Sequence, residues 1–245
     1  MMEPEVQAAV RQDSATRTHQ WLALSLTPGI GAGRGRKVVE LFNGIDRLFS
    51  ATLTELEGAG LPAATAQSLA MGRSLELAAE ELDRGKSSGV RVVAQDDPDY
   101  PKRLYEIYDP PLVLYVKGST EVINKYGLSV VGTRHPTPYG LGMAERLACD
   151  LAARGLVIVS GMARGIDSAA HRGALNAHGQ TVAIWGTGVD VTYPKENQKL
   201  ADQILATGGA ILSEFPLGTF PAPQNFPIRN RIISDVHRRP RNRSW

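Results

Sequence analysis

The sequence predicts an α/β protein in which an extended Rossmann-like parallel sheet is preceded by a small all-helical domain. Helical periodicity dominates residues 18–84, whereas short apolar runs alternate with helical segments after residue 90. Successive apolar runs in the later part lie about 25 to 28 positions apart, which is the spacing of right-handed βαβ units. These observations favour a doubly wound sheet.

The predicted domain boundaries follow the changes of periodicity. Residues 1–17 are polar and should be disordered, 18–84 form the helical domain, and 85–89 (GKSSG) read as a linker. The α/β domain then spans 90–234, and 235–245 form a basic tail. Within the helical domain, Thr52 and Glu55 have the spacing of a capping box. Helical segments are expected at 20–26, 35–42, 54–58, 63–71 and 74–83.

The α/β domain is expected to begin with two strands and to continue in regular alternation. The segment between the first two strands is rich in Asp and Pro and should be a loop with at most a short helix. Strands are expected at 90–94, 112–116, 128–131, 156–159, 181–185 and 209–213, and helices at about 138–154, 165–178 and 195–206.

Composition narrows the class of protein. With 245 residues, 42% of them hydrophobic, the chain can bury a core without disulfides, and the single Cys149 is typical of a reducing compartment. The sequence contains neither a signal peptide nor an apolar run long enough to span a membrane, so we expect a cytoplasmic protein. The net charge of +2 is uneven, because residues 225–245 contribute +5 and residues 1–224 contribute −3.

Three glycine-containing loops follow three successive predicted strands. Their sequences are Gly132-Thr133-Arg134, Ser160 to Gly165 (SGMARG) and Gly186-Thr187-Gly188. In a parallel sheet such loops meet at the carboxyl edge, where helix N-termini present free N–H groups. Glycine allows close approach of an anion, and the hydroxyls of Thr133, Ser160 and Thr187 could donate to it. We therefore expect a phosphate-binding edge, although tight turns also favour glycine for purely structural reasons.

The same loops argue against a cofactor. The first loop lacks the G-x-G-x-x-G pattern of dinucleotide sites, no Walker pattern occurs, and no residues have metal-ligand spacing. We expect no catalytic residues, no metal and no cofactor. A nucleotide or nucleoside-phosphate hydrolase that uses Asp167 or His171 as acid or base is the alternative. The simpler explanation of the pair is that Asp167 is favoured by the dipole at a helix start and that His171, one turn later, bonds to it.

Cationic and aromatic residues surround this edge in the sequence. Arg134 and Arg164 lie in the loops, Lys195 opens the third helix, and Phe226 is followed by Arg229-Asn230-Arg231. Cations that follow a backbone and aromatic rings that stack on bases are how proteins hold single-stranded nucleic acid. We expect Phe226 to be exposed for stacking and Trp185 to be part of the core.

Five segments in order resemble the DprA/Smf family, the bacterial DNA-processing proteins of natural transformation. They are DYPKRLYEIYDPPLVLYVKG (99–118), SVVGTR (129–134), SGMARGIDSAAHRGAL (160–175), GTGVDVTYPKEN (186–197) and SEFPLGTFPAPQNFPIRNRIIS (213–234). The resemblance implies a protein, not an enzyme, that binds and protects incoming single-stranded DNA and loads the recombinase RecA on it, with a homodimer as a further expectation. It implies DNA contacts from Gly132, Thr133, Arg134, Ser160, Gly161, Arg164, Lys195, Arg229, Asn230 and Arg231.

Two segments, one near the start of the chain and one at its end, lead to further expectations. The turn from Pro28 to Gly31 is similar to a helix-hairpin-helix motif in a sterile-alpha-motif-like domain, and it either touches DNA or is only structural. After Ser234 the family pattern stops, and the chain reads DVHRRPRNRSW, including Arg238, Arg239, Arg241 and Arg243. This departure leaves open whether the late strands, the dimer surface and the RecA contacts of the family are present, and a fragment that does not fold completely is a third alternative.

Overall fold

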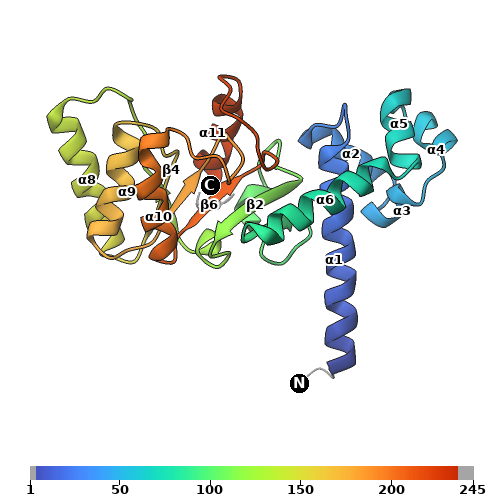
Figure 1. Ribbon diagram of the computed structural model, residues 1–245, viewed down its shortest axis with the longest axis horizontal. Helices are drawn as coiled ribbons and strands as arrows, with labels where there is room; N and C mark the ends of the chain where they lie inside the picture. Colours follow the sequence, from blue (N-terminus) through green and yellow to red (C-terminus); the bar gives the residue numbers. More distant parts are fainter. Residues whose placement is uncertain (1–3, 237–245) are drawn as a thin grey trace, which may run out of the picture. The chain divides into compact units, whose positions relative to one another are not determined.

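The computed structural model describes residues 4–236, which fall into two compact units (Figure 1). The helical unit comprises the chain through Ser87 together with Val92–Pro98 and Tyr108–Val113. The sheet unit comprises Ser88–Arg91, Asp99–Ile107 and the chain from Leu114 onward. The division therefore differs from one boundary near residue 89, because two later segments join the helical unit. The basic tail at 237–245, with its four arginines, lies outside the described residues.

The helical unit contains six helices around a core of leucine and alanine side chains. The predicted capping box is confirmed: the Thr52 side chain accepts from Glu55 N, and the Glu55 side chain accepts from Thr52 N at 2.7 Å. The short helix α3 was not predicted. The helices are α1 (Pro4–Leu26), α2 (Ala32–Leu41), α3 (Ile45–Phe49), α4 (Leu53–Gly58), α5 (Ala63–Ala70) and α6 (Arg73–Ser87).

Two boundaries of the helical unit differ from the sequence expectations. Disorder is expected through residue 17, but α1 begins at Pro4. Residues 5–9 (EVQAA) include good helix formers, and intrinsic propensity can form a helix without an apolar stripe. The expected linker at 85–89 is also largely helical, since α6 continues to Ser87 and buries Gly85.

The sheet has six strands in the order β1-β2-β6-β5-β4-β3. Strands β3 to β6 are parallel, as predicted, whereas β2 pairs with β6 in antiparallel orientation. The connections between strands also contain three short elements: the α-helix α7 (Lys102–Tyr105) and the 3₁₀ helices η1 (Val122–Asn124) and η2 (Lys195–Asn197). The strands are β1 (Val90–Ala94), β2 (Val113–Gly118), β3 (Gly127–Ser129), β4 (Val157–Ser160), β5 (Thr181–Ile184) and β6 (Ala210–Ser213).

Three crossover helices join the parallel strands: α8 (Pro138–Ala152), α9 (Ile166–Asn176) and α10 (Gln198–Ala206). Helix α9 packs against both α8 and α10, and Figure 1 shows the three grouped together. Because β3 to β6 follow one another in a single direction, right-handed crossovers place all three helices on the same face. The reversal of strand order that a doubly wound sheet needs does not occur within residues 4–236.

Small side chains allow the helices to lie close to the strands and to each other. The core beneath α8 and α9 is made by Val130, Ala148, Ala152, Ile158, Ala170 and Ala174. Helix α11 (Asn225–Asp235), which was not predicted, contacts β5, and the Ser129 hydroxyl of β3 donates to Ile233 O near its end. Pro227 does not prevent this helix because it lies in the first turn, where its missing N–H is not needed.

Candidate nucleic-acid interface

The loops that follow β3 and β4 meet at one carboxylate. Asp167, in the first turn of α9, is 5% exposed and accepts from Gly161 N at 3.1 Å and from Gly132 N and Ala163 N at 3.4 Å. Backbone N–H groups that the sequence assigns to phosphate therefore hold an internal acid. Burial raises the pKa of Asp167 above its ordinary value, while the three N–H groups and the charge of Arg229 act in the opposite direction.

Packing explains the two glycines at these loops. A Cβ atom on Gly132 would lie 2.7 Å from Ile166 Cγ1, and one on Gly161 would collide with the Arg229 guanidinium. Both positions therefore need glycine for space inside the protein. The sequence predicted that glycine at these positions allows an anion to approach closely. The need for space inside the protein is a second reason for glycine, and the two reasons are compatible.

Arg229 lies inside the protein instead of reaching into solvent. It is 5% exposed, and its Nη1 donates to Gly161 O at 2.7 Å and to Ile184 O, so it links the ends of β4 and β5 to α11. Its Nε has no hydrogen-bond partner among the residues that the structure describes. Burial lowers the pKa of Arg229 to about 10, with the charge of Arg134 adding to this and that of Asp167 opposing it. The phosphate contact predicted for Arg229 is therefore replaced by carbonyl contacts in this structure.

Phe226 lies at the centre of the candidate site. Its ring is half-buried, with the Tyr193 ring 5.6 Å away and tilted by 36°, and with the Arg134 and Arg229 guanidinium carbons at 5.6 and 5.9 Å. Hollows lie on two sides of it. We call them together the Phe226 pocket. One side is lined by Gly161, Arg164, Tyr193 and Pro194, and the other by Val131, Gly132, Asp167, Asn230, Ile233 and Ser234. Four residues line both sides: Arg134, Ala163, Phe226 and Arg229.

Two of the predicted cations are exposed without a partner. Among the described residues, the side chains of Arg134 and Lys195 make no hydrogen bond or ion pair, although the Arg134 guanidinium lies over the Phe226 ring. Arg134 lines the Phe226 pocket, whereas Lys195 lies beside it, directly after Pro194. Asn230 is exposed on α11 and lines the pocket as well.

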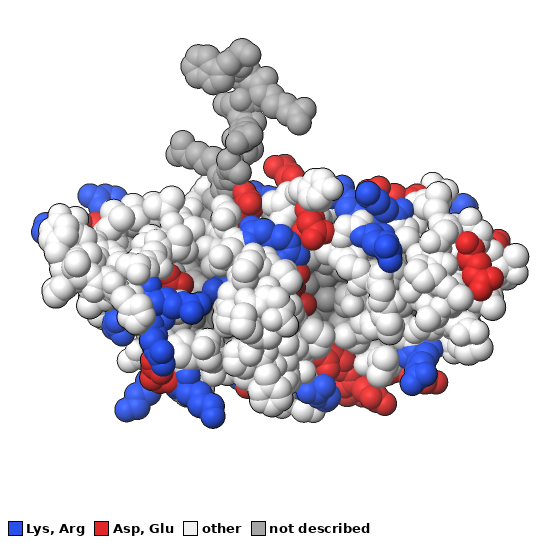
Figure 2. All heavy atoms as spheres, turned by 90° about the horizontal axis from the view of Figure 1, so that it is seen from above, with Lys and Arg blue, Asp and Glu red and all other residues white. Residues whose placement is uncertain are grey.

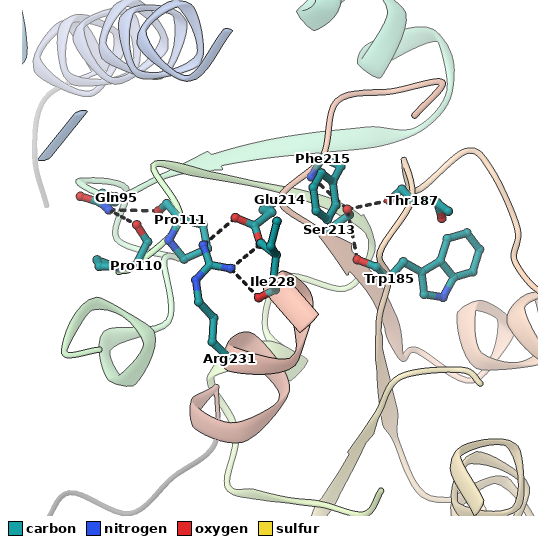
Figure 3. Close-up of polar contacts among 10 residues, drawn as sticks. All are labelled: Gln95, Pro110, Pro111, Trp185, Thr187, Ser213, Glu214, Phe215, Ile228 and Arg231. Carbon is teal, nitrogen blue, oxygen red and sulfur yellow. Dashed lines mark hydrogen bonds and ion pairs between the residues drawn. The ribbon is translucent and has the colours of Figure 1, made fainter. Parts of the chain in front are cut away.

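The two remaining predicted cations, Arg164 and Arg231, form ion pairs with acids. Arg164 forms a two-pronged ion pair with Glu196, with Nη2 and Oε2 3.0 Å apart, and this contact raises the pKa of Arg164 and lowers that of Glu196. Arg231 forms a similar pair with Glu214 and also donates to Ile228 O at 2.8 Å (Figure 3). Figure 2 shows the same mixture over the sheet unit, where basic side chains gather with acidic ones beside them.

The predicted hydroxyl donors have internal partners. Ser160 is buried and donates to Val130 O at 2.6 Å, and Thr187 donates to Val191 O at 2.7 Å. Ser213 in turn donates to Thr187 O, which ties the third loop to the end of β6 (Figure 3). Thr133 is exposed, and its hydroxyl oxygen accepts from His135 N at 3.2 Å. Of these three hydroxyls, only that of Thr133 is open to a ligand.

Asp167 and His171 are not arranged as a catalytic pair. His171 is fully buried, its Nδ1 lies 2.7 Å from Thr181 Oγ1, and burial lowers its pKa to about 3. Thr181 Oγ1 donates to Ile158 O, so this chain of contacts links α9 to β5 and β4. The arrangement does not favour the hydrolase alternative. Within the described residues no group of His, Cys, Asp and Glu is placed to hold a metal ion.

Several features of the site could not be recognised from residue type alone. One is the pairing of Glu196 and Glu214: both acids stand in the quoted motifs, but their pairing with arginines distant in sequence depends on the fold.

Two residues near the sheet differ in burial. Trp185 is 3% exposed, which confirms its predicted place in the core, whereas Cys149 is half-buried. In the helical unit, Gly29 has a φ of 82° and Thr65 Oγ1 donates to Pro28 O at 2.9 Å, which anchors the predicted turn.

The fold and the site together define a Rossmann-like α/β protein with a cationic and aromatic pocket at the carboxyl edge of its sheet. The chain belongs to the family described as DNA recombination-mediator protein A, whose family model matches residues 91–238. The resemblance to DprA/Smf proteins is thereby confirmed. No helix in the described part of the chain has the length and apolar character needed to cross a membrane.

Named relatives agree with this assignment. The chain is 36% identical over 225 residues to Protein Smf of Synechocystis sp., covering 89% of this chain and 56% of that protein. It is 44% identical over 142 residues to DNA processing protein DprA of Streptococcus pneumoniae, covering 58% and 50%. The chain thus spans about half the length of the curated relatives it matches.

Two solved structures are similar to the protein. The X-ray structure of DNA processing protein A from Streptococcus pneumoniae has a TM-score of 0.75 at 31% identity, covering 89% of this chain and 75% of that one. A structure that concerns the single-stranded DNA binding mode of DNA processing protein A from Helicobacter pylori has a TM-score of 0.52 at 34% identity. It covers 59% of this chain and 64% of that one.

Proposed function

We propose that the sheet unit binds single-stranded DNA at the Phe226 pocket. The observation that carries the proposal is the position of the Phe226 ring, at an open hollow and 5.6 Å from the unpaired cation Arg134. A base that stacks on such a ring contributes about 1–3 kcal/mol in other proteins, and the neighbouring cation is placed to meet the phosphate that follows. The single-stranded DNA binding mode described for the Helicobacter pylori protein supports the choice of ligand.

The residues divide into contacts and supports under this proposal. Arg134 and Lys195 meet phosphates, and Thr133 and Asn230 add polar contacts. Arg164 joins them when its guanidinium exchanges Glu196 for a phosphate, and Arg231 would have to leave Glu214 in the same way. Gly132, Ser160, Gly161 and Arg229 contribute by shaping the pocket, because their polar groups contact other parts of the protein.

The test is the salt dependence of binding to a labelled oligothymidine, measured by fluorescence anisotropy. Log K should fall linearly with log salt by about 0.7 per phosphate neutralised, so the double variant Arg134→Ala/Lys195→Ala should weaken binding and make the slope shallower by about 1.4. Arg146→Ala, which removes an exposed cation from α8, is the control and should leave both quantities unchanged. If the double variant binds like the control at every salt concentration, the proposed pocket is wrong.

Stacking is tested separately with Phe226→Leu, which keeps an apolar side chain but removes the ring. Loss of one stacked base should raise Kd by about 5- to 100-fold with little change in the salt slope, because no cation is lost. An unchanged Kd would show that no base stacks on Phe226.

We further propose that the bound DNA is the incoming strand of natural transformation, that this cytoplasmic protein protects it, and that it loads RecA on it. Support comes from the family description as a recombination mediator and from the relatives named DNA processing protein DprA. A shorter lag in RecA filament formation on oligonucleotides already coated with a single-strand-binding protein would support loading. An unchanged lag would contradict it, and sedimentation equilibrium tests the homodimer.

A further inference from the structure

The carboxyl edge of the sheet contains the parts of an anion site, and a side chain of the protein occupies it. Asp167 Oδ2 accepts from Gly161 N and Ala163 N, and Oδ1 accepts from Gly132 N, at 3.1 to 3.4 Å. Backbone N–H groups that converge in this way at a helix N-terminus are a common cradle for phosphate. Here the ligand of the cradle is a carboxylate that belongs to the chain itself.

A second observation shows that this position is suited to an anion. Arg229 is 95% buried, its charge acts on Asp167, and its Nε has no hydrogen-bond partner within residues 4–236. Arg229 and Asp167 line the same side of the Phe226 pocket, and that side has a volume of about 370 Å³. A cation, three N–H groups and an open approach are therefore present together, and the hollow is large enough for a phosphate group.

We infer that Asp167 acts as a resident anion that keeps free phosphate and the phosphates of mononucleotides out of this cradle. The carboxylate satisfies the three N–H groups, balances Arg229 and repels a second anion that would enter the hollow. DNA phosphates are then confined to the outer cations Arg134 and Lys195. Only this last step rests on the proposed function. Asp167 is thus a specificity-determining residue. It prevents simple phosphate binding in the cradle, so that a ligand of the pocket also needs a base that can stack.

The experiment removes the resident anion and measures binding of inorganic phosphate by thermal unfolding. Asp167→Ala opens the cradle and leaves three N–H groups and Arg229 without an anion. We expect phosphate to raise Tm of this variant by about 3–6 °C once its concentration reaches ten times Kd, whereas the wild type shows no saturable shift. Asp150→Ala, which removes an exposed acid from α8 and changes the net charge equally, should behave like the wild type.

A second variant covers the case in which Asp167→Ala does not fold. Asp167→Asn keeps the size of the side chain and one acceptor oxygen but removes the negative charge, so we expect a phosphate-dependent rise in Tm that is smaller than that of the alanine variant. If Asp167→Ala is unfolded, Asp167→Asn alone decides. The inference is overturned if no folded variant gains a saturable shift, or if Asp150→Ala gains the same one.

The outcome does not depend on DNA binding. Wild-type anisotropy with oligothymidine tests the proposed function, while the phosphate titration uses no nucleic acid. A wild type that does not bind oligothymidine, combined with a phosphate-binding Asp167→Ala, would refute the proposed function and leave the role of Asp167 intact.

Discussion

Substitution of Arg229 by alanine should destabilise the sheet unit far more than substitution of the exposed Arg134. The Arg229 guanidinium donates to Gly161 O and Ile184 O inside the protein, and its charge acts on the buried Asp167 carboxylate. Removal of Arg229 leaves the two buried carbonyls without their donor and Asp167 without a compensating charge, which together should cost about 3–5 kcal/mol. Arg134→Ala removes only a surface side chain and should change the free energy of unfolding by less than about 0.5 kcal/mol.

Urea unfolding followed by Trp185 fluorescence measures this difference in the sheet unit. Trp185 is 3% exposed, and replacement of Trp21 and Trp245 by Phe in every variant leaves it as the only tryptophan. Arg229→Lys should lie between wild type and Arg229→Ala, because it keeps the charge but cannot reproduce the planar guanidinium. A loss below about 1 kcal/mol in Arg229→Ala would refute the assignment of Arg229 as an internal support and return it to the set of DNA contacts.

Three further predictions follow from other contacts. Glu196→Gln should tighten binding to oligothymidine by about two- to fivefold and steepen the salt slope, because Arg164 loses its competing acid; unchanged binding would show that Arg164 does not meet phosphate. Because burial lowers the pKa of His171 to about 3, the unfolded chain takes up a proton at a higher pH than the folded chain does. This contribution should lower stability by up to about 1.4 kcal/mol per pH unit as pH falls from 6.5 towards 3, and it should be missing from urea titrations of His171→Asn. Thr52→Ala should cost about 1 kcal/mol through loss of the capping box; equal thermal stability of variant and wild type would show that the cap contributes nothing.

The acids that pair with the site arginines affect which ligands the proposed site would favour. Glu196 and Glu214 neutralise two of the four arginines predicted to contact DNA, and Asp167 balances a third. Under the proposed function, a DNA strand would have to compete with carboxylates that are already in place. This favours ligands that offer several phosphates and a stacking base at once, and it disfavours small anions.

The sequence alone was sufficient for most of the architecture. Apolar runs and helical periodicity locate strands β1 to β6 and helices α8 to α10, because these elements are determined by local burial patterns that repeat every 2 or 3.6 residues. The capping box at Thr52 is local for the same reason. By contrast, α3 and α11 were missed: α3 has only five residues, and a proline in the first turn obscures α11.

The directions of the site's side chains were decided only by the tertiary structure. Arg134 and Arg229 are the same residue type near the same edge, yet one is exposed over Phe226 and the other is buried against carbonyls of β5 and the loop after β4. The Asp167 carboxylate accepts a hydrogen bond from Gly132 N, which lies 35 residues earlier in the chain. Residue type sets which contacts a side chain can make, but the choice among them depends on which groups the folded chain brings within hydrogen-bonding distance, and sequence spacing does not contain that information.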